Sequence, residues 1–218
     1  MITTATILSG VAQGLIWAIL TLGVYLTFRI LDIADLTVEG TFPLGAAVTV
    51  VLINTGMSPA MAMLCALLAG AAAGFITGFL HTIFQIPAIL SGILTMIALY
   101  SVNIRIMSDK ATVALEQPSL KTWMLSLLPE GTVSNTVSII LGTVFCLLIV
   151  ALLYYFFGTE IGCAVRATGS NQNMARSLGV KTDRVIILGL MISNALVALS
   201  GSLIAQLDYG SALVTMGQ

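Results

Sequence analysis

Three carboxylates interrupt the first apolar part of the chain and are the residues best suited to chemistry there. Asp32, Asp35 and Glu39 are spaced by three and four residues, which predicts one helical face. Charges at membrane depth are costly and usually functional, so a solute pathway is one interpretation. The other is that the segment reaches the cytoplasmic surface, where water solvates it. Both stay open for Asp32 and Asp35, whereas Glu39 directly precedes an apparent helix break at Gly40 and favours the pathway.

Three single amides lie in otherwise apolar runs: Asn103, Asn194 and Gln206. A buried amide can hydrogen-bond two membrane helices together, or it can contact a solute. With Asp35 and Glu39 they make up the predicted pathway set.

Other kinds of chemistry lack the residues they need. His81 has no carboxylate or cysteine partner at ligand spacing, so no metal site is predicted. No nucleophile and base can be paired, so the subunit is not predicted to be an enzyme. The phosphate-binding motif GxxxxGK[ST] is absent. No cofactor is therefore expected in this chain, and ATP and Mg²⁺ would bind to a partner.

The polar insert Thr159 to Arg184 carries four of the eight basic residues and lies between two membrane-length apolar runs. Retention of Lys and Arg on the inner side predicts a cytoplasmic loop. A short helix is expected within it, with Ser170 or Asn171 as N-cap and Gly179 as left-handed C-cap. Met174, Ala175 and Leu178 fall on one face of that helix. A helix this short is marginal in water, so we expect a partner to dock on it.

The composition is that of a polytopic membrane protein, with 58% hydrophobic and 8% charged residues. We predict an all-α fold in a single transmembrane domain, 1–218. The expected membrane segments are 7–30, 41–54, 58–83, 87–107, 135–157 and 185–207. The second is too short to cross alone, and Pro43 near its start indicates an interrupted helix. A cytoplasmic insert places the N-terminus and the loop 108–134 outside.

A stripe of glycines at four-residue spacing, Gly70, Gly74 and Gly78, predicts close helix packing. Packing within the subunit is favoured over a dimer interface.

Three runs of sequence carry a resemblance: GTEIGCAVRATGSNQNMARSLGVKTDRVI, DIADLTVEGTFPLGAAV and GLMISNALVALSGSLIAQ. They resemble permease subunits of bacterial ABC importers in the branched-chain amino acid and ribose permease superfamily. The nearest likeness is to a subgroup assigned to tryptophan or tyrosine uptake. The resemblance covers about Gly10 to Gln218.

The resemblance implies a plasma-membrane permease that works as a pair, together with ABC ATPase subunits and an extracytoplasmic substrate-binding protein. The helix Asn171 to Leu178 would be the coupling helix that contacts the ATPase. The solute would be a small organic molecule, an aromatic amino acid above all. Similar permeases continue past the equivalent of Gln218, so at least two further membrane segments are expected.

Two other classes of protein compete with this interpretation. An ion-coupled secondary transporter would use Asp32, Asp35 or Glu39 as its proton or sodium site. A membrane enzyme is disfavoured because no catalytic constellation can be assembled from the sequence.

Overall fold

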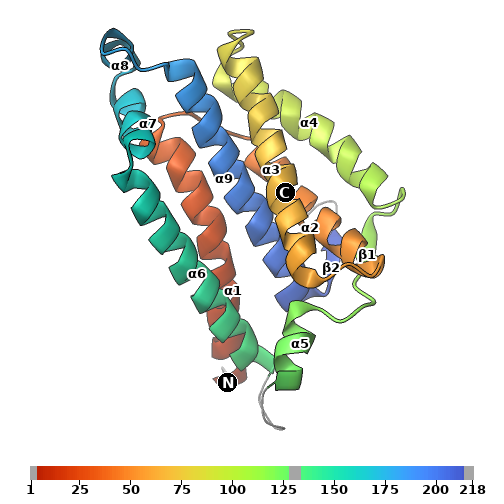
Figure 1. The fold of residues 1–218 in the computed structure, drawn as a ribbon. Coiled ribbons are helices and arrows are strands. Elements are labelled where there is room, and N and C mark those ends of the chain that lie inside the picture. Colours follow the sequence, from red (N-terminus) through yellow and green to blue (C-terminus); the bar gives the residue numbers. More distant parts are fainter. Residues whose placement is uncertain (1–3, 128–133, 214–218) are drawn as a thin grey trace.

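The computed structural model describes residues 4–127 and 134–213. Long apolar helices dominate it and run roughly side by side (Figure 1). Those that form membrane-crossing segments are α1 (Thr4–Tyr25), α3 (Pro59–Thr82), α4 (Ala88–Ile106), α6 (Ser134–Gly158) and α9 (Thr182–Ile204), and the shorter α2 (Val38–Asn54) lies among them. Within these described ranges, five spans are long and apolar enough to cross a membrane, which confirms the helical, polytopic fold class. Residues 128–133 of the predicted outer loop lie outside the described part.

Helix α9 is the centre of the bundle, with α1, α2 and α3 packed around it (Figure 1). Most of its length is buried, and it is rich in Ala, Ser and Gly from Ser193 to Ser202. Small side chains let neighbouring backbones come close in lipid, where no hydrophobic effect drives helices together. A central helix of this composition therefore packs tightly on several sides.

The glycine stripe of α3 lies directly against α9. A Cβ on Gly70 would come within 2.5 Å of the Asn194 carbonyl oxygen, and one on Gly78 within 2.9 Å of the Ile187 Cα. Gly74 meets the Leu190 carbonyl in the same way. The stripe thus serves a contact inside the subunit.

The first crossing ends in an irregular segment. Helix α1 continues as a π-helical turn, η1 (Leu26–Ile30), and Asp32 then takes a left-handed conformation with φ of 56°. Residues 31–36 form no helix, and α2 starts at Val38. The interruption was predicted, but its place was wrong: Gly40 lies inside α2, three residues into the helix.

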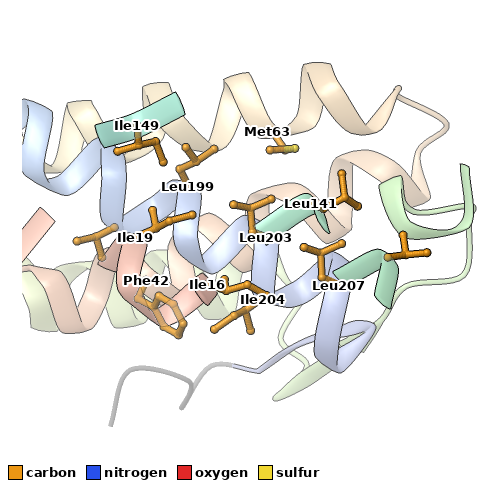
Figure 2. Close-up of a cluster of buried hydrophobic side chains, with 12 residues drawn as sticks. Ile16, Ile19, Phe42, Met63, Leu141, Ile149, Leu199, Leu203, Ile204 and Leu207 are labelled. Carbon is orange, nitrogen blue, oxygen red and sulfur yellow. The ribbon is translucent and has the colours of Figure 1, made fainter. Parts of the chain in front are cut away.

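The largest apolar cluster joins residues from α1, α2, α3, α6 and α9 (Figure 2). Ile16 and Ile19 of α1 meet Phe42 of α2 and Leu203 and Ile204 of α9. This cluster holds the start of α2 in place although the chain before it is irregular.

One end of the bundle carries a small sheet that the all-α prediction did not contain. Strand β1 (Thr112–Ala114) pairs antiparallel with β2 (Ser211–Leu213), which follows the π-helical turn η2 (Ala205–Tyr209). Asn54 secures the same loop, because its side chain donates to the Ala114 carbonyl and accepts from the Glu116 amide. Helix α5 (Leu120–Leu127) lies at the same end and contacts η2 and α6.

The opposite end carries two short helices, α7 (Glu160–Ser170) and α8 (Gln172–Ser177), between α6 and α9 (Figure 1). Gly169 of α7 lies against the carbonyl of Ile30, at the start of the irregular segment. The polar insert therefore touches the chain where the first crossing is interrupted.

Candidate functional site

The irregular segment brings the chain into the middle of the bundle. Residues 31–36 form no helix, and the 17 residues of α2 cover about 25 Å, which is less than the thickness of a hydrocarbon core. Thr41 near the start of α2 bonds to Asn194, which is near the middle of the Thr182–Asp208 span. Helix α2 therefore begins deep in the membrane, as interrupted helices of transporters do.

Asp35 and Asn194 form the centre of a buried polar network. Asp35 is 1% exposed and accepts bonds from the Thr37 amide, at 2.9 Å, and from the Asn194 side-chain nitrogen, at 2.7 Å. Asn194 also donates to the Leu190 carbonyl and accepts from the Thr41 hydroxyl. Burial of polar groups is tolerated only when they are hydrogen-bonded, and these are.

Two further pairs of buried hydroxyl groups form hydrogen bonds beside this network. Thr37 and Thr77 share a bond of 2.7 Å, and Thr49 donates to Ser202 at 2.7 Å. Sequence reasoning missed these residues. A four-residue spacing of small or hydroxyl-bearing residues could have revealed them: Thr37, Thr41, Gly45 and Thr49. Residues at this spacing share one face of a helix, so the pattern indicates a polar face that packs closely against a neighbouring helix.

The three acidic residues do not share a face, contrary to the prediction. Asp32 is exposed next to the polar insert, Asp35 is buried, and Glu39 is exposed in the first turn of α2. The prediction was wrong because residues 31–36 form no helix, so helical spacing does not apply to Asp32 and Asp35.

Glu39 and Asn103 border a cavity of about 220 Å³ between α2 and α4, which we call the α2–α4 cavity. Its lining residues are Glu39, Gly40, Pro43, Met96, Ile97, Tyr100 and Asn103. Asn103 is fully buried and donates to the Gly40 carbonyl at 3.2 Å. Its side-chain oxygen has no partner among the described residues.

Gln206 contacts neither Asp35 and Asn194 nor the lining of the α2–α4 cavity. It accepts from the Leu120 amide and donates to Ser202. Nearby, Lys121 donates to the Leu207 carbonyl and Gln13 donates to Asp208. The structure therefore brings together Asp35 with Asn194, and Glu39 with Asn103, and it places Gln206 at the end that carries the sheet.

The short helix α8 has the caps that the sequence indicated. Asn171 is its N-cap and accepts from the Met174 amide at 3.0 Å, and Gly179 has φ of 88°. Met174 and Leu178 are 55% and 72% exposed, whereas Ala175 is fully buried. Met174 and Leu178 thus form the exposed apolar surface, and Ala175 holds the helix against the bundle.

Among residues 4–127 and 134–213, no group of three or more His, Cys, Asp or Glu side chains could hold a metal ion. His81 instead shares a bond of 2.8 Å with the Ile86 carbonyl.

Comparison with known proteins places the chain among transport permeases. The family model described as the branched-chain amino acid transport system permease component matches residues 6–217. The tyrosine transport system permease protein of Clostridioides difficile is 41% identical over 211 residues, which cover 97% of this chain and 68% of that relative. The uncharacterized protein RP368 of Rickettsia prowazekii is 37% identical over 219 residues, covering 97% and 74%.

A more distant relative is the autoinducer 2 import system permease protein LsrC of Photorhabdus laumondii. It is 30% identical over 207 residues, which cover 93% of this chain but 57% of the relative. No solved structure shows a significant match to the chain.

Proposed function

Because the chain belongs to the permease component family of branched-chain amino acid transport systems, we propose that it is the membrane-spanning permease subunit of an ATP-driven ABC importer. It works as a pair of permeases around a shared pathway. A separate extracytoplasmic binding protein delivers the solute, and separate ATPase subunits bind ATP and Mg²⁺. The similarity to a tyrosine system permease supports an aromatic amino acid as the solute.

The observation that supports the ATP-driven proposal is the way α8 is attached to the bundle. Two apolar side chains of this helix, Met174 and Leu178, are exposed at the end of the bundle. The helix is attached to the bundle through the buried Ala175 and through Arg176, which donates to Thr182 at 3.0 Å and pairs with Asp183 at 3.0 Å. An attached helix with an exposed apolar surface suits docking into a groove of another protein.

The position of α7 suggests how movement of α8 reaches the pathway. Gly169, at the end of α7, lies against Ile30, directly before the irregular segment. ATP binding can shift the permease only if the ATPase contacts the two conformations of α8 unequally. In that case a displaced α8 moves α7 and thereby the 31–37 segment that leads to Asp35.

The proposed location is the bacterial plasma membrane, with the polar insert in the cytoplasm and the N-terminus outside. Arg29 and the insert then bring five basic residues to the inner side, and Arg105, Lys110 and Lys121 are outside. This bias agrees with the retention of Lys and Arg on the inside.

An ion-coupled mechanism finds less support in the geometry. Both oxygens of Asp35 already accept bonds from Thr37 and Asn194, and Asp32 is exposed at the end of the bundle. Of the three acidic residues, Glu39 alone remains as a coupling site.

The decisive experiment is tyrosine uptake into proteoliposomes that contain the permease, its ATPase and its binding protein. We expect uptake to require ATP and to survive ionophores that collapse proton and sodium gradients. Uptake that follows the ion gradient and ignores ATP would contradict the proposal.

The same assay tests α8. Replacing Met174 or Leu178 with Asp places a charge in an apolar contact, and we expect about 10-fold or more loss of ATP-driven uptake and weaker ATPase binding. Met57→Asp is the matched control, because Met57 is a half-exposed methionine at the opposite end of the bundle. Normal uptake and assembly in both α8 variants would remove α8 as the docking helix.

A further inference from the structure

We propose that the α2–α4 cavity binds the ammonium group of the transported solute, with Glu39 and Asn103 as its acceptors. This inference rests on the proposed transport function and adds the chemistry by which the solute is recognised inside the membrane. The cavity is defined by residues of one chain and lies on the side of α2 that faces α4.

The polar atoms that Asn103 and the α2 backbone offer to the cavity are acceptors. The Asn103 amide nitrogen must face the Gly40 carbonyl, since that carbonyl can only accept. Its side-chain oxygen is thereby left free, and it is buried without a partner among the described residues. An unpaired buried acceptor is costly, so a donor that reaches it is bound favourably.

The first turn of α2 adds two more acceptors. The Glu39 carboxylate borders the cavity and has no hydrogen-bond or ion-pair partner among the residues that the structure describes. Pro43 has no backbone N–H, so the carbonyl of Glu39 lacks its usual helical donor. An ammonium group carries three N–H donors and a positive charge, which matches this set of acceptors.

The remaining lining suits the body of an amino acid. Met96, Ile97 and the ring of Tyr100 are apolar surface, and an aromatic face also attracts a cation. At about 220 Å³ the cavity is smaller than a pocket for a drug-sized ligand. It therefore takes the ammonium head and adjoining atoms of a small solute.

The depth of Glu39 supports a pathway position rather than contact with lipid. Glu39 is two residues from Thr41, which bonds to Asn194 near the middle of the α9 span. An exposed carboxylate in hydrocarbon is strongly disfavoured, and such groups face the inside of an assembly or a water-filled cavity. None of the described residues that line the cavity is a cation that could neutralise it.

The test is protection of a single introduced thiol in the full permease assembled with its ATPase. Ile97→Cys places the thiol in the cavity lining, and Cys65, Cys146 and Cys163 are replaced by Ser. A neutral thiol reagent is applied with tyrosine, with tyramine, which keeps the amine but lacks the carboxylate, or with desaminotyrosine, which lacks the amine. We expect tyrosine and tyramine to slow labelling and desaminotyrosine not to.

In the Glu39→Gln background we expect protection by tyramine to need about 10-fold higher concentrations, because a hydrogen bond to a charged group is lost. Glu116→Gln is the control, since Glu116 is an exposed carboxylate in the loop at the end of the bundle that carries the sheet. Equal protection by desaminotyrosine and tyramine, unchanged protection in Glu39→Gln, or no protection by any compound would overturn the proposal.

Labelling needs no ATP hydrolysis. A complex without ATP-driven uptake but with amine-dependent protection would therefore contradict the proposed transport mechanism and still support the ammonium site. ATP-driven uptake without amine-dependent protection would support the proposed transport mechanism and contradict the ammonium site.

Discussion

The two sides of α2 differ in how completely their polar groups are paired. Toward α9, Thr41 bonds to Asn194, Thr49 bonds to Ser202, and Gly45 lies directly against the Ala198 backbone. Toward α4, Asn103 keeps an unpaired oxygen and Glu39 borders a cavity. Helix α2 is therefore closely packed and fully hydrogen-bonded toward α9, and incompletely packed and paired toward α4.

This difference indicates which parts of the bundle move together. In lipid, helices are held by close packing and hydrogen bonds, because the tails are as apolar as the side chains. The α2–α9 contact has both, so these two helices are expected to move as one body. The α2–α4 contact borders a cavity and an unsatisfied group, so we expect α4 to be held less tightly than α9.

The largest expected effect is on stability, when one methyl group is added to the side of α2 that faces α9 or to the side that faces α4. At Gly45 an added Cβ would clash with the backbone of Ala198, whereas at Gly40 its nearest neighbours are Leu99 atoms at 3.1 Å. We expect Gly45→Ala to cost about 3 kcal/mol or more and Gly40→Ala about 1 kcal/mol or less. Thermal unfolding of both variants in detergent measures the difference. Equal melting temperatures would show that the two sides pack alike.

A smaller difference should separate the two amides. Asn194→Leu removes one of the two donors to the buried Asp35 carboxyl group, and we expect a loss of about 2–3 kcal/mol. Asn103→Leu breaks one bond to a carbonyl but also removes the unpaired oxygen, so about 1 kcal/mol or less is expected. Unfolding of the two variants by denaturant provides the measurement. A larger loss for Asn103→Leu would reverse the comparison.

The smallest effect on stability should accompany a clear effect on transport. Glu39→Gln and Asp32→Asn both change exposed carboxylates, so neither should lower stability by more than about 0.5 kcal/mol. We expect Glu39→Gln to reduce tyrosine uptake more than Asp32→Asn, since Glu39 borders the cavity and Asp32 lies at the end of the bundle. Equal and negligible effects on uptake would support a merely solvated position for Glu39.

Local patterns in the sequence were sufficient for the features that depend on a few neighbouring residues. The length and apolarity of the spans, the cap at Asn171 and the left-handed Gly179 are of this kind. The acidic residues were not predictable in this way. Their spacing indicates one helical face, but residues 31–36 form no helix, and Asp35 bonds to the Thr37 amide and to Asn194, 159 residues away.

A bundle of membrane helices with a polar insert follows from the amino-acid sequence alone, because apolar length and charge distribution are sufficient for that inference. Which polar atoms are paired and which are not becomes visible only in the folded bundle. Asn103 and Asn194 have the same side chain in similar apolar runs, yet both polar atoms of Asn194 are hydrogen-bonded, whereas Asn103 has a partner for its nitrogen and none for its oxygen among the described residues. The cause is that hydrogen bonds and close contacts in this bundle join helices far apart in sequence, so a local pattern cannot identify the partners.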